Sequence, residues 1–176
     1  MKQETKEGIK LGGRFIVEVY DKDMNLISKS ETHNIIPTEG CNFALDQIGA
    51  GAAQVAALYC LMFETDTTPA AGTTYATPVF TETTAYTEET RPEYVPAAAS
   101  GKSMSNTANK AVFTMNASKT LYGAALVGGG TAPTTKGNTD GGGKMLAAGK
   151  FGTAQPVISG NVVNLTYTLS SDDDGA

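Results

Sequence analysis

The chain lacks tryptophan, contains one histidine and two cysteines, and has few charged residues for a length of 176. Charged side chains make up 18% and hydrophobic ones 40%, which excludes a chain kept disordered by its charge. No apolar run approaches the roughly 20 residues that cross a bilayer. The segment Met1–Glu7 also lacks the apolar stretch of a secretory signal peptide. We therefore expect one soluble domain, made in the cytoplasm and without a membrane partner.

Basic residues are scarce and scattered along the chain. Thirteen Lys and Arg oppose 18 Asp and Glu, which gives a formal net charge of −5. Proteins that bind nucleic acid neutralise phosphates with clustered basic side chains. Because the sequence has no such cluster, we do not expect a nucleic-acid partner. The balance favours a protein that meets another protein surface.

The cysteines and the histidine form no recognisable catalytic or metal-binding pattern. Cys41 and Cys60 lie in apolar sequence, and we expect both thiols to be buried and reduced. They do not belong to a Cys-x-x-Cys pair, so a structural zinc site is not predicted. His33 has no nucleophile and acid at the spacing of a catalytic triad. We interpret it as a polar residue at a strand–loop junction.

The glycine-rich and acidic segments also depart from known binding motifs. A phosphate-binding loop needs Gly-x-x-x-x-Gly-Lys followed by Ser or Thr, whereas Gly143-Lys144 has Asn138 at the first glycine position and Met145 after it. Paired carboxylates hydrolyse sugars only across a cleft that is usually lined with aromatic side chains, and the clustered acids lie in predicted loops without such a cleft. We therefore predict no catalytic residue, no metal site and no cofactor, and we do not expect an enzyme.

The clearest local structure is a β-hairpin near the N-terminus. Along Arg14–Tyr20, apolar side chains occupy every second position, as in a strand with one buried face. Turn-forming residues fill Asp21–Asn25, and Leu26–Ser30 can return as the partner strand.

One helix is predicted, with Thr38 as its N-cap. Apolar residues follow at the spacing i, i+3, i+4 and i+7, which places them on one face: Cys41, Ala44, Leu45 and Ile48. We expect this face to pack on the domain and Gly49 to end the helix. The apolar segment Gln54–Phe63 fits a buried helix or a buried strand by periodicity alone. Its glycine-rich approach and its exit rich in Thr and Pro favour a central strand.

Several further strand-like segments alternate with turns and with two long loops rich in Gly and Thr, at 64–78 and 128–143. Many short strands joined by turn-rich loops are typical of an antiparallel sandwich. We predict a mainly β fold, an antiparallel β-sandwich of jelly-roll or immunoglobulin-like type with one short α-helix. Residues 1–13 end in two glycines and are expected to form a flexible N-terminal arm, and residues 14–176 a single sandwich domain.

The polar, aromatic stretch Thr81–Tyr94 contains the candidate partner-binding residues. Tyr86, Arg91 and Tyr94 belong to the residue types that are enriched in interface hot spots. The same side chains could equally be packed into the core of the domain, and the sequence leaves both interpretations open.

Several segments together resemble a widespread group of small structural proteins encoded by tailed bacteriophages. The segments that carry the resemblance are Phe15–Lys22, His33–Ile36, Glu39–Asp46, Thr84–Pro92, Ala97–Ser103 and the acidic end Ser171–Ala176. The resemblance covers nearly the whole chain after residue 13. It rests on turn and strand signals, so it indicates a lineage more than a role.

The resemblance implies a non-enzymatic virion protein, assembled in the bacterial cytoplasm. Our first expectation is a capsid decoration or cement protein that binds the major capsid protein and stabilises the head as a homo-oligomer, for which a trimer is one candidate. The alternative is a tail-associated adaptor or fibre-anchoring protein. A carbohydrate-binding module would share the sandwich, but the absence of tryptophan argues against it. The arm 1–13 would contact a neighbouring protein in the particle.

Overall fold

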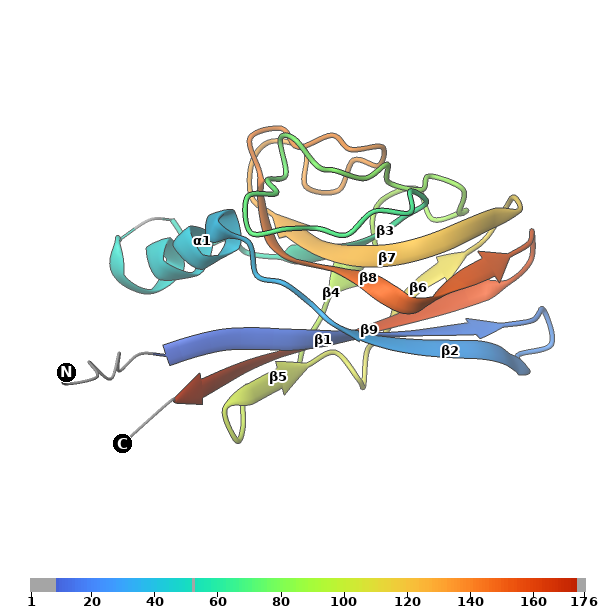
Figure 1. Ribbon diagram of the computed structural model, residues 1–176, viewed down its shortest axis with the longest axis horizontal. Helices are drawn as coiled ribbons and strands as arrows, with labels where there is room; N and C mark the ends of the chain where they lie inside the picture. The colour runs from blue at the N-terminus through green and yellow to red at the C-terminus, as the bar shows by residue number, and fades with distance from the viewer. Residues whose placement is uncertain (1–8, 52, 174–176) are drawn as a thin grey trace, which may run out of the picture.

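The computed structural model describes residues 9–51 and 53–173 as two antiparallel β-sheets packed face to face, with one helix at one end (Figure 1). The prediction of a mainly β, antiparallel sandwich with one short helix is confirmed. The elements in chain order are β1 Ile9–Tyr20, β2 Leu26–His33, α1 Thr38–Gly49, β3 Leu58–Phe63, β4 Glu93–Tyr94, β5 Ser103–Ser105, β6 Ala111–Thr114, β7 Lys119–Gly128, β8 Lys144–Val157 and β9 Val162–Asp173.

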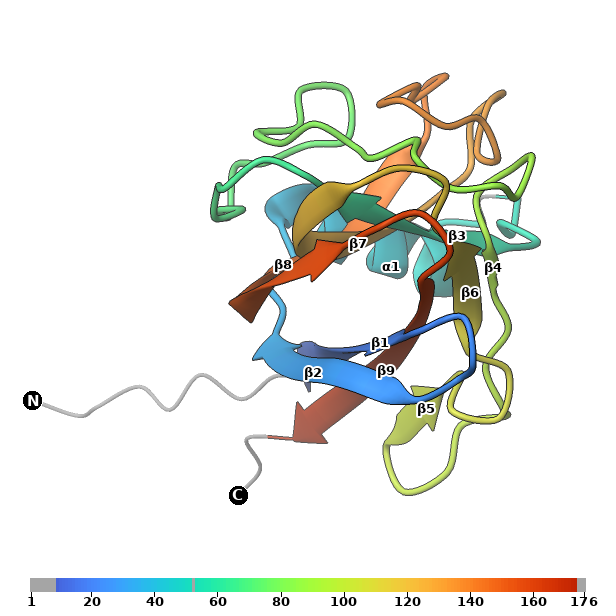
Figure 2. The same cartoon turned by 90° about the vertical axis from the view of Figure 1, so that its right-hand side faces the viewer.

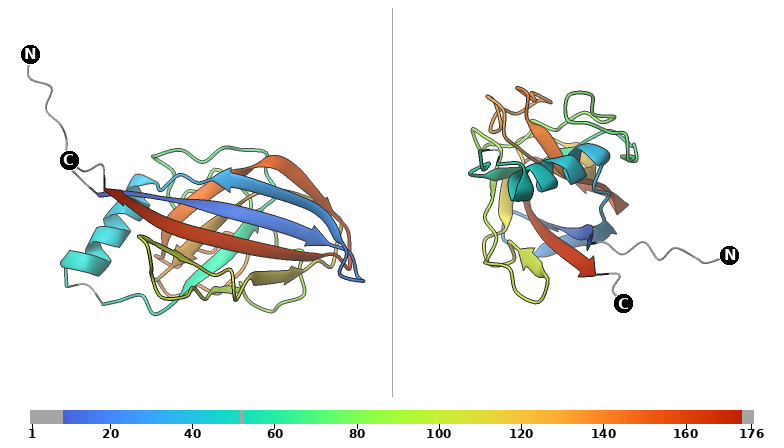
Figure 3. Two further views of the ribbon diagram at one scale, coloured as in Figure 1. Left: turned by 90° about the horizontal axis from the view of Figure 1, so that it is seen from below. Right: turned by 90° about the vertical axis from the view of Figure 1, so that its left-hand side faces the viewer.

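The two sheets have the strand orders β2-β1-β9-β5 and β4-β3-β7-β8, and we call them sheet A and sheet B. β6 also belongs to sheet A, because it pairs with the first part of β9 while β5 pairs with a later part. The predicted hairpin is β1 and β2. β1 pairs with β9 from Ile9 opposite Asp173 to Tyr20 opposite Val162, so both strands run the length of the molecule (Figure 3).

The expected N-terminal arm is wrong over residues 9–13, which form the first part of β1 and pair with the end of β9. Gly13, which suggested flexibility in the sequence, is instead needed for close packing. A Cβ atom at this position would lie 2.4 Å from the carbonyl oxygen of Thr168. The rest of the predicted arm, residues 1–8, lies outside the described residues.

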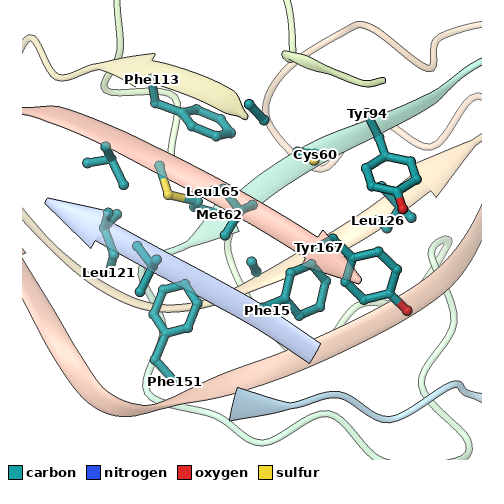
Figure 4. Close-up of a cluster of buried hydrophobic side chains, with 14 of the residues drawn as sticks. Phe15, Cys60, Met62, Tyr94, Phe113, Leu121, Leu126, Phe151, Leu165 and Tyr167 are labelled. Carbon is teal, nitrogen blue, oxygen red and sulfur yellow. The ribbon is translucent and has the colours of Figure 1, made fainter. Parts of the chain in front are cut away.

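The main core lies between the two sheets (Figures 2 and 4). Alternate residues of β1, including Phe15, point inward and meet side chains of sheet B such as Met62 and Leu126. Phe15 also packs against Tyr167 of β9, with 4.5 Å between the ring centroids. The alternating apolar residues of Arg14–Tyr20 therefore form part of the buried face of sheet A.

β3 is a central strand of sheet B, as predicted, and it is buried on both faces. Cys60 and Met62 face the main core, whereas Leu61 and Phe63 face a second apolar cluster on the other side of the sheet. Strands covered on both faces read as continuous apolar runs rather than as alternating ones. This explains why the periodicity of Gln54–Phe63 was uninformative. The strand begins at Leu58, four residues after the predicted segment.

The helix ends at Gly49, as predicted, but its buried face is different from the predicted one. Gly40 and Phe43 are buried, whereas Leu45 is 65% exposed and Ile48 is 84% exposed. α1 approaches β8 so closely that a Cβ atom on Gly40 would lie 2.2 Å from the carbonyl oxygen of Leu146. Gly40 therefore determines which face of the helix packs on the sheet. A pattern of apolar residues cannot predict this, because glycine is not part of such a pattern. The N-cap is Pro37 rather than Thr38.

The two cysteines are both free, and only one of them is buried. Cys60 lies in the main core, where burial raises the pKa of its thiol to about 12. Cys41 lies on α1 and is exposed, so the prediction of two buried thiols is wrong for this residue. The same unexpected rotation of the helix accounts for its exposure.

Candidate functional site

The outer face of sheet B is covered by two long segments, residues 64–92 and 129–143, which we call the loop layer (Figures 1 and 2). Between the sheet and the loop layer lies the second apolar cluster, to which Tyr75 and Phe80 contribute from the loops. The rings of Phe80 and Phe63 stack with 4.4 Å between their centroids. The predicted surface loops are thus loops, but they carry a core of their own.

The centre of the loop layer is an ion pair between Glu82 and Arg91. The guanidinium donates from Nε to Oε1 of Glu82 at 2.8 Å and from Nη2 to Oε2 at 2.7 Å. Both side chains are fully shielded from solvent. This two-point geometry fixes the relative orientation of the two groups, and it joins two parts of the first loop segment that lie nine residues apart.

The same ion pair holds the second loop segment. Oε2 of Glu82 accepts hydrogen bonds from the backbone N–H groups of Gly137 at 2.9 Å and Asn138 at 2.8 Å. Arg91 donates from Nη1 to the carbonyl oxygen of Pro133 at 3.0 Å. The side chain of Asn138 in turn accepts from the backbone N–H of Glu82 and donates to the carbonyl oxygen of Phe80. One buried carboxylate and one guanidinium thereby connect both segments.

The electrostatics keep Arg91 charged inside the protein. Burial alone lowers the pKa of its guanidinium, but the hydrogen bonds and the negative charge of Glu82 outweigh this and raise the pKa overall. The ring centroid of Tyr75 lies 5.4 Å from the guanidinium carbon of Arg91. Burial raises the pKa of the Tyr75 phenol to about 12. A buried ion pair contributes little net stability, but it penalises every arrangement that separates its members. We infer that it selects one conformation of the loop layer.

A second attachment point lies at Lys136. Its ammonium group donates to the carbonyl oxygens of Tyr86 at 3.1 Å and Glu88 at 2.7 Å, and it lies 4.2 Å from the centroid of the Tyr86 ring. The carboxylate of Glu88 accepts from the backbone N–H of Thr114 in β6. The loop layer is therefore also tied to an edge of sheet A.

The three predicted partner-binding residues are all buried, which contradicts their proposed role. Tyr86 and Arg91 are each 1% exposed, and Tyr94 is 5% exposed. Tyr86 packs edge-on against Phe113, and Tyr94, in the main core, packs against Tyr167 (Figure 4). The alternative interpretation, in which these side chains pack inside their own domain, is the one the structure shows. Burial raises the pKa of both phenols.

The exposed part of the loop layer consists mostly of small, uncharged side chains. Threonine, alanine and glycine dominate the exposed positions of its two segments, for example Ala76, Thr77 and Thr84. Such residues lose little side-chain entropy when they are covered. Because the backbone beneath them is already held in place, little further ordering of the layer would be needed if this surface were covered.

The remaining candidate chemistry concerns the histidine, metal ligands and membrane spans. His33 is the last residue of β2, as its interpretation as a strand-end residue requires. Within residues 9–51 and 53–173, no three His, Cys, Asp or Glu side chains converge as metal ligands would. None of the described helices has the length and apolar character of a membrane span.

No protein-family model and no curated protein matches the chain. The function of the loop layer must therefore follow from its own geometry and surface chemistry.

Proposed function

We propose that the chain is a non-enzymatic structural protein of a tailed bacteriophage particle, and that it decorates the capsid by binding the major capsid protein through the loop layer. The proposal rests on the loop layer, whose two segments are held in one conformation by the buried ion pair between Glu82 and Arg91. The resemblance of the sequence to small phage structural proteins supplies the class of partner.

A decoration protein must add contacts between coat subunits without rearranging when it binds. Long loops are ordinarily the most mobile part of a domain, and ordering them on binding would reduce the affinity. In this protein the buried ion pair and Lys136 order them in advance. The net charge of −5 also suits a position on the outside of a shell, away from the packaged nucleic acid.

The test is to mix the purified protein with empty capsids that lack it and to count the copies bound per shell. We expect saturable binding of many copies. Ala76→Arg places a long cation on the exposed surface of the loop layer and should abolish binding. Ala98→Arg is the matched control, because Ala98 is an equally small, exposed residue on the β4–β5 connection outside the loop layer. It should leave binding unchanged.

Two results would overturn parts of the proposal. Equal binding by both variants would remove the loop layer as the contact surface. Absence from shells, with a few copies found only on purified tails, would replace decoration by the tail-adaptor alternative.

A further inference from the structure

One edge of sheet A is left open near the N-terminal end of β1. β2 pairs with β1 only from Arg14 onward, whereas β9 pairs with β1 along its whole length (Figure 3). After His33 the chain leaves sheet A and forms a bridge to β8 of sheet B. Within the described residues, the segment Ile9–Gly12 therefore has a neighbouring strand on one side only.

The backbone groups that face this open edge follow from the hydrogen bonds beside it. The carbonyl oxygen of Gly13 accepts from the N–H of Asn34 at 3.2 Å, so Gly13 directs its backbone groups toward the side of β2. In an antiparallel strand, the N–H and C=O groups of every second residue point to the same edge. Those of Leu11 therefore face the open edge. An edge with unpaired backbone groups is a template for a further extended strand.

A polar hollow lies on the outer face of sheet A beside this edge. It has a volume of about 550 Å³, and the cationic or titratable side chains that line it are Lys10, Arg14 and His33. Gly12 lies between Lys10 and Arg14, and a Cβ atom on it would have only the hydroxyl of Ser170 within 4 Å, at 3.9 Å. Gly12 therefore leaves room above the strand for a side chain from a neighbour.

The charge nearest to an added strand would be positive. Side chains directly opposite each other on neighbouring strands interact most closely, and Lys10 lies on β1 itself. Among the described residues, no carboxylate lies within 4 Å of its ammonium group. The acid of the hollow, Asp172, lies on β9, one strand further from the edge. Glu31 of β2 contacts Arg14 through Nη1 at 2.8 Å.

We propose that the open edge binds an extended acidic segment of a partner protein, which adds a strand to sheet A in line with β2. The side chains of the added strand would alternate between the two faces of the sheet. Those opposite Lys10 and Gly12 would lie on the outer face, where carboxylates meet the ammonium of Lys10 and the guanidinium of Arg14. The side chain opposite Leu11 would lie on the inner face, where Leu11 and Phe43 line an apolar groove. The segment is therefore one in which acidic and apolar residues alternate.

Lys10 also determines which strands are rejected. Charged side chains at an open edge prevent pairing with strands that do not neutralise them, and like charges directly opposite each other are destabilising. The edge therefore admits an acidic segment and rejects a basic one. The contact lies on sheet A, whereas the loop layer covers sheet B, so it is independent of the proposed capsid contact.

The test titrates the isotope-labelled full-length protein with a synthetic peptide of alternating aspartate and valine, followed by NMR. We expect saturable shifts of the backbone amide signals of Ile9–Arg14 and slower hydrogen exchange of the Leu11 N–H, which the added strand would cover. A peptide with lysine in place of aspartate should not shift these signals. A peptide of the same composition with its aspartates and valines grouped should not shift them either.

Two variants each remove one feature of the edge. Leu11→Pro deletes the N–H that faces the open edge, and proline is tolerated there because this N–H does not belong to the ladder with β9. Lys10→Glu reverses the charge at an exposed position. Both variants should lose the shifts with the aspartate peptide, and Lys10→Glu should gain shifts with the lysine peptide. Lys22→Glu is the matched control, because Lys22 is an exposed lysine in the turn between β1 and β2, and it should bind like the unaltered protein.

The charge reversal alone decides the outcome if Leu11→Pro does not match the circular dichroism of the unaltered protein. Absence of saturable shifts with the aspartate peptide would overturn the proposal. Equal binding of the aspartate and lysine peptides, or unchanged binding by Lys10→Glu, would do the same. In sedimentation velocity, a dimer of the unaltered protein that Leu11→Pro separates would assign the edge to a second copy of the chain and would also overturn it.

Discussion

At the scale of single residues, the contact between Glu82 and Arg91 has the largest structural consequence. Two charges are removed from water, at a desolvation cost that their mutual attraction roughly offsets. What they add is the requirement that residues 133–139 lie where the remaining hydrogen-bonding groups can be satisfied. The pair therefore determines the conformation of the loop layer more than it stabilises the fold.

Arg91→Met should destabilise the protein strongly, because it leaves the carboxylate of Glu82 buried without its partner. We expect a loss of about 3–5 kcal/mol in the free energy of unfolding, measured by urea denaturation. The double variant Glu82→Gln/Arg91→Met should lose less than the single one, since no charge is then buried. Arg14→Met, which removes an exposed ion pair to Glu31, should lose at most about 1 kcal/mol. A double variant that loses as much free energy of unfolding as Arg91→Met, or more, would contradict this account.

The central role of this pair could not be predicted from the sequence. The residue types of Tyr86, Arg91 and Tyr94 are common in interfaces, but aromatic residues are equally common in cores. In the sequence, Glu82 lies in an acidic stretch with Glu88 and Glu89, and no feature of the sequence distinguishes it from them. Only the fold brings the second loop segment to Glu82, and no short-range pattern records that approach.

At the scale of elements, α1 shows how a correct prediction of a helix can accompany a wrong prediction of its face. The spacing of Cys41, Ala44, Leu45 and Ile48 predicted the element, since these residues lie on one side of a helix. In the protein, however, α1 approaches β8 through Gly40 and buries Phe43 beside it. Leu45 and Ile48, which the spacing predicted to be buried, remain exposed to solvent on the other side of the helix.

Gly40→Ala should destabilise the packing of α1 on β8, because the new methyl group would meet the backbone of Leu146, which cannot move aside easily. We expect a loss of about 1–3 kcal/mol in urea denaturation, as for other overpacked sites. Gly49→Ala is the matched control in the same helix, with open space around the new atom. It should be neutral or stabilising by up to about 1 kcal/mol. Similar effects of the two substitutions would argue against glycine-mediated packing.

At the scale of the whole molecule, the two-sheet architecture was predictable and the third layer was not. Alternation along β1 and β9 has a period of two, which only a sheet with one buried face explains. The loop layer has no period, because its buried side chains, such as Tyr75 and Phe80, come singly from polar sequence. Residues 9–13 were predicted to be part of an arm because they end in two glycines, but they continue the longest ladder of the fold.

The acid stability of the molecule should depend on Glu18, which lies between Lys110 at 2.6 Å and Lys29 at 3.1 Å. The hydrogen bond from Lys110 is the largest cause that lowers the pKa of Glu18 below its ordinary value of 4.5. The stabilisation is therefore complete above that value and is lost as the pH falls through the lower pKa of the folded protein. Glu18→Gln should be less stable than the unaltered protein at neutral pH, and the difference should shrink in acid. Urea midpoints measured between about pH 7 and pH 3 test this, and a constant difference would refute it.

The ladder between β1 and β9 also determines how the molecule responds to mechanical force. Ile9 and Asp173 are paired at one end of the ladder, and inter-strand hydrogen bonds in an antiparallel pair run across the strands. Tension applied between these two residues acts along the hydrogen bonds, so it would break the bonds of the ladder sequentially, starting at this end. Tension along the long axis of the molecule, applied to β1 at Ile9 and to β9 at Val162, would instead load all the bonds of the ladder together in shear. The sandwich is therefore strong along its length and weak where its two terminal strands meet.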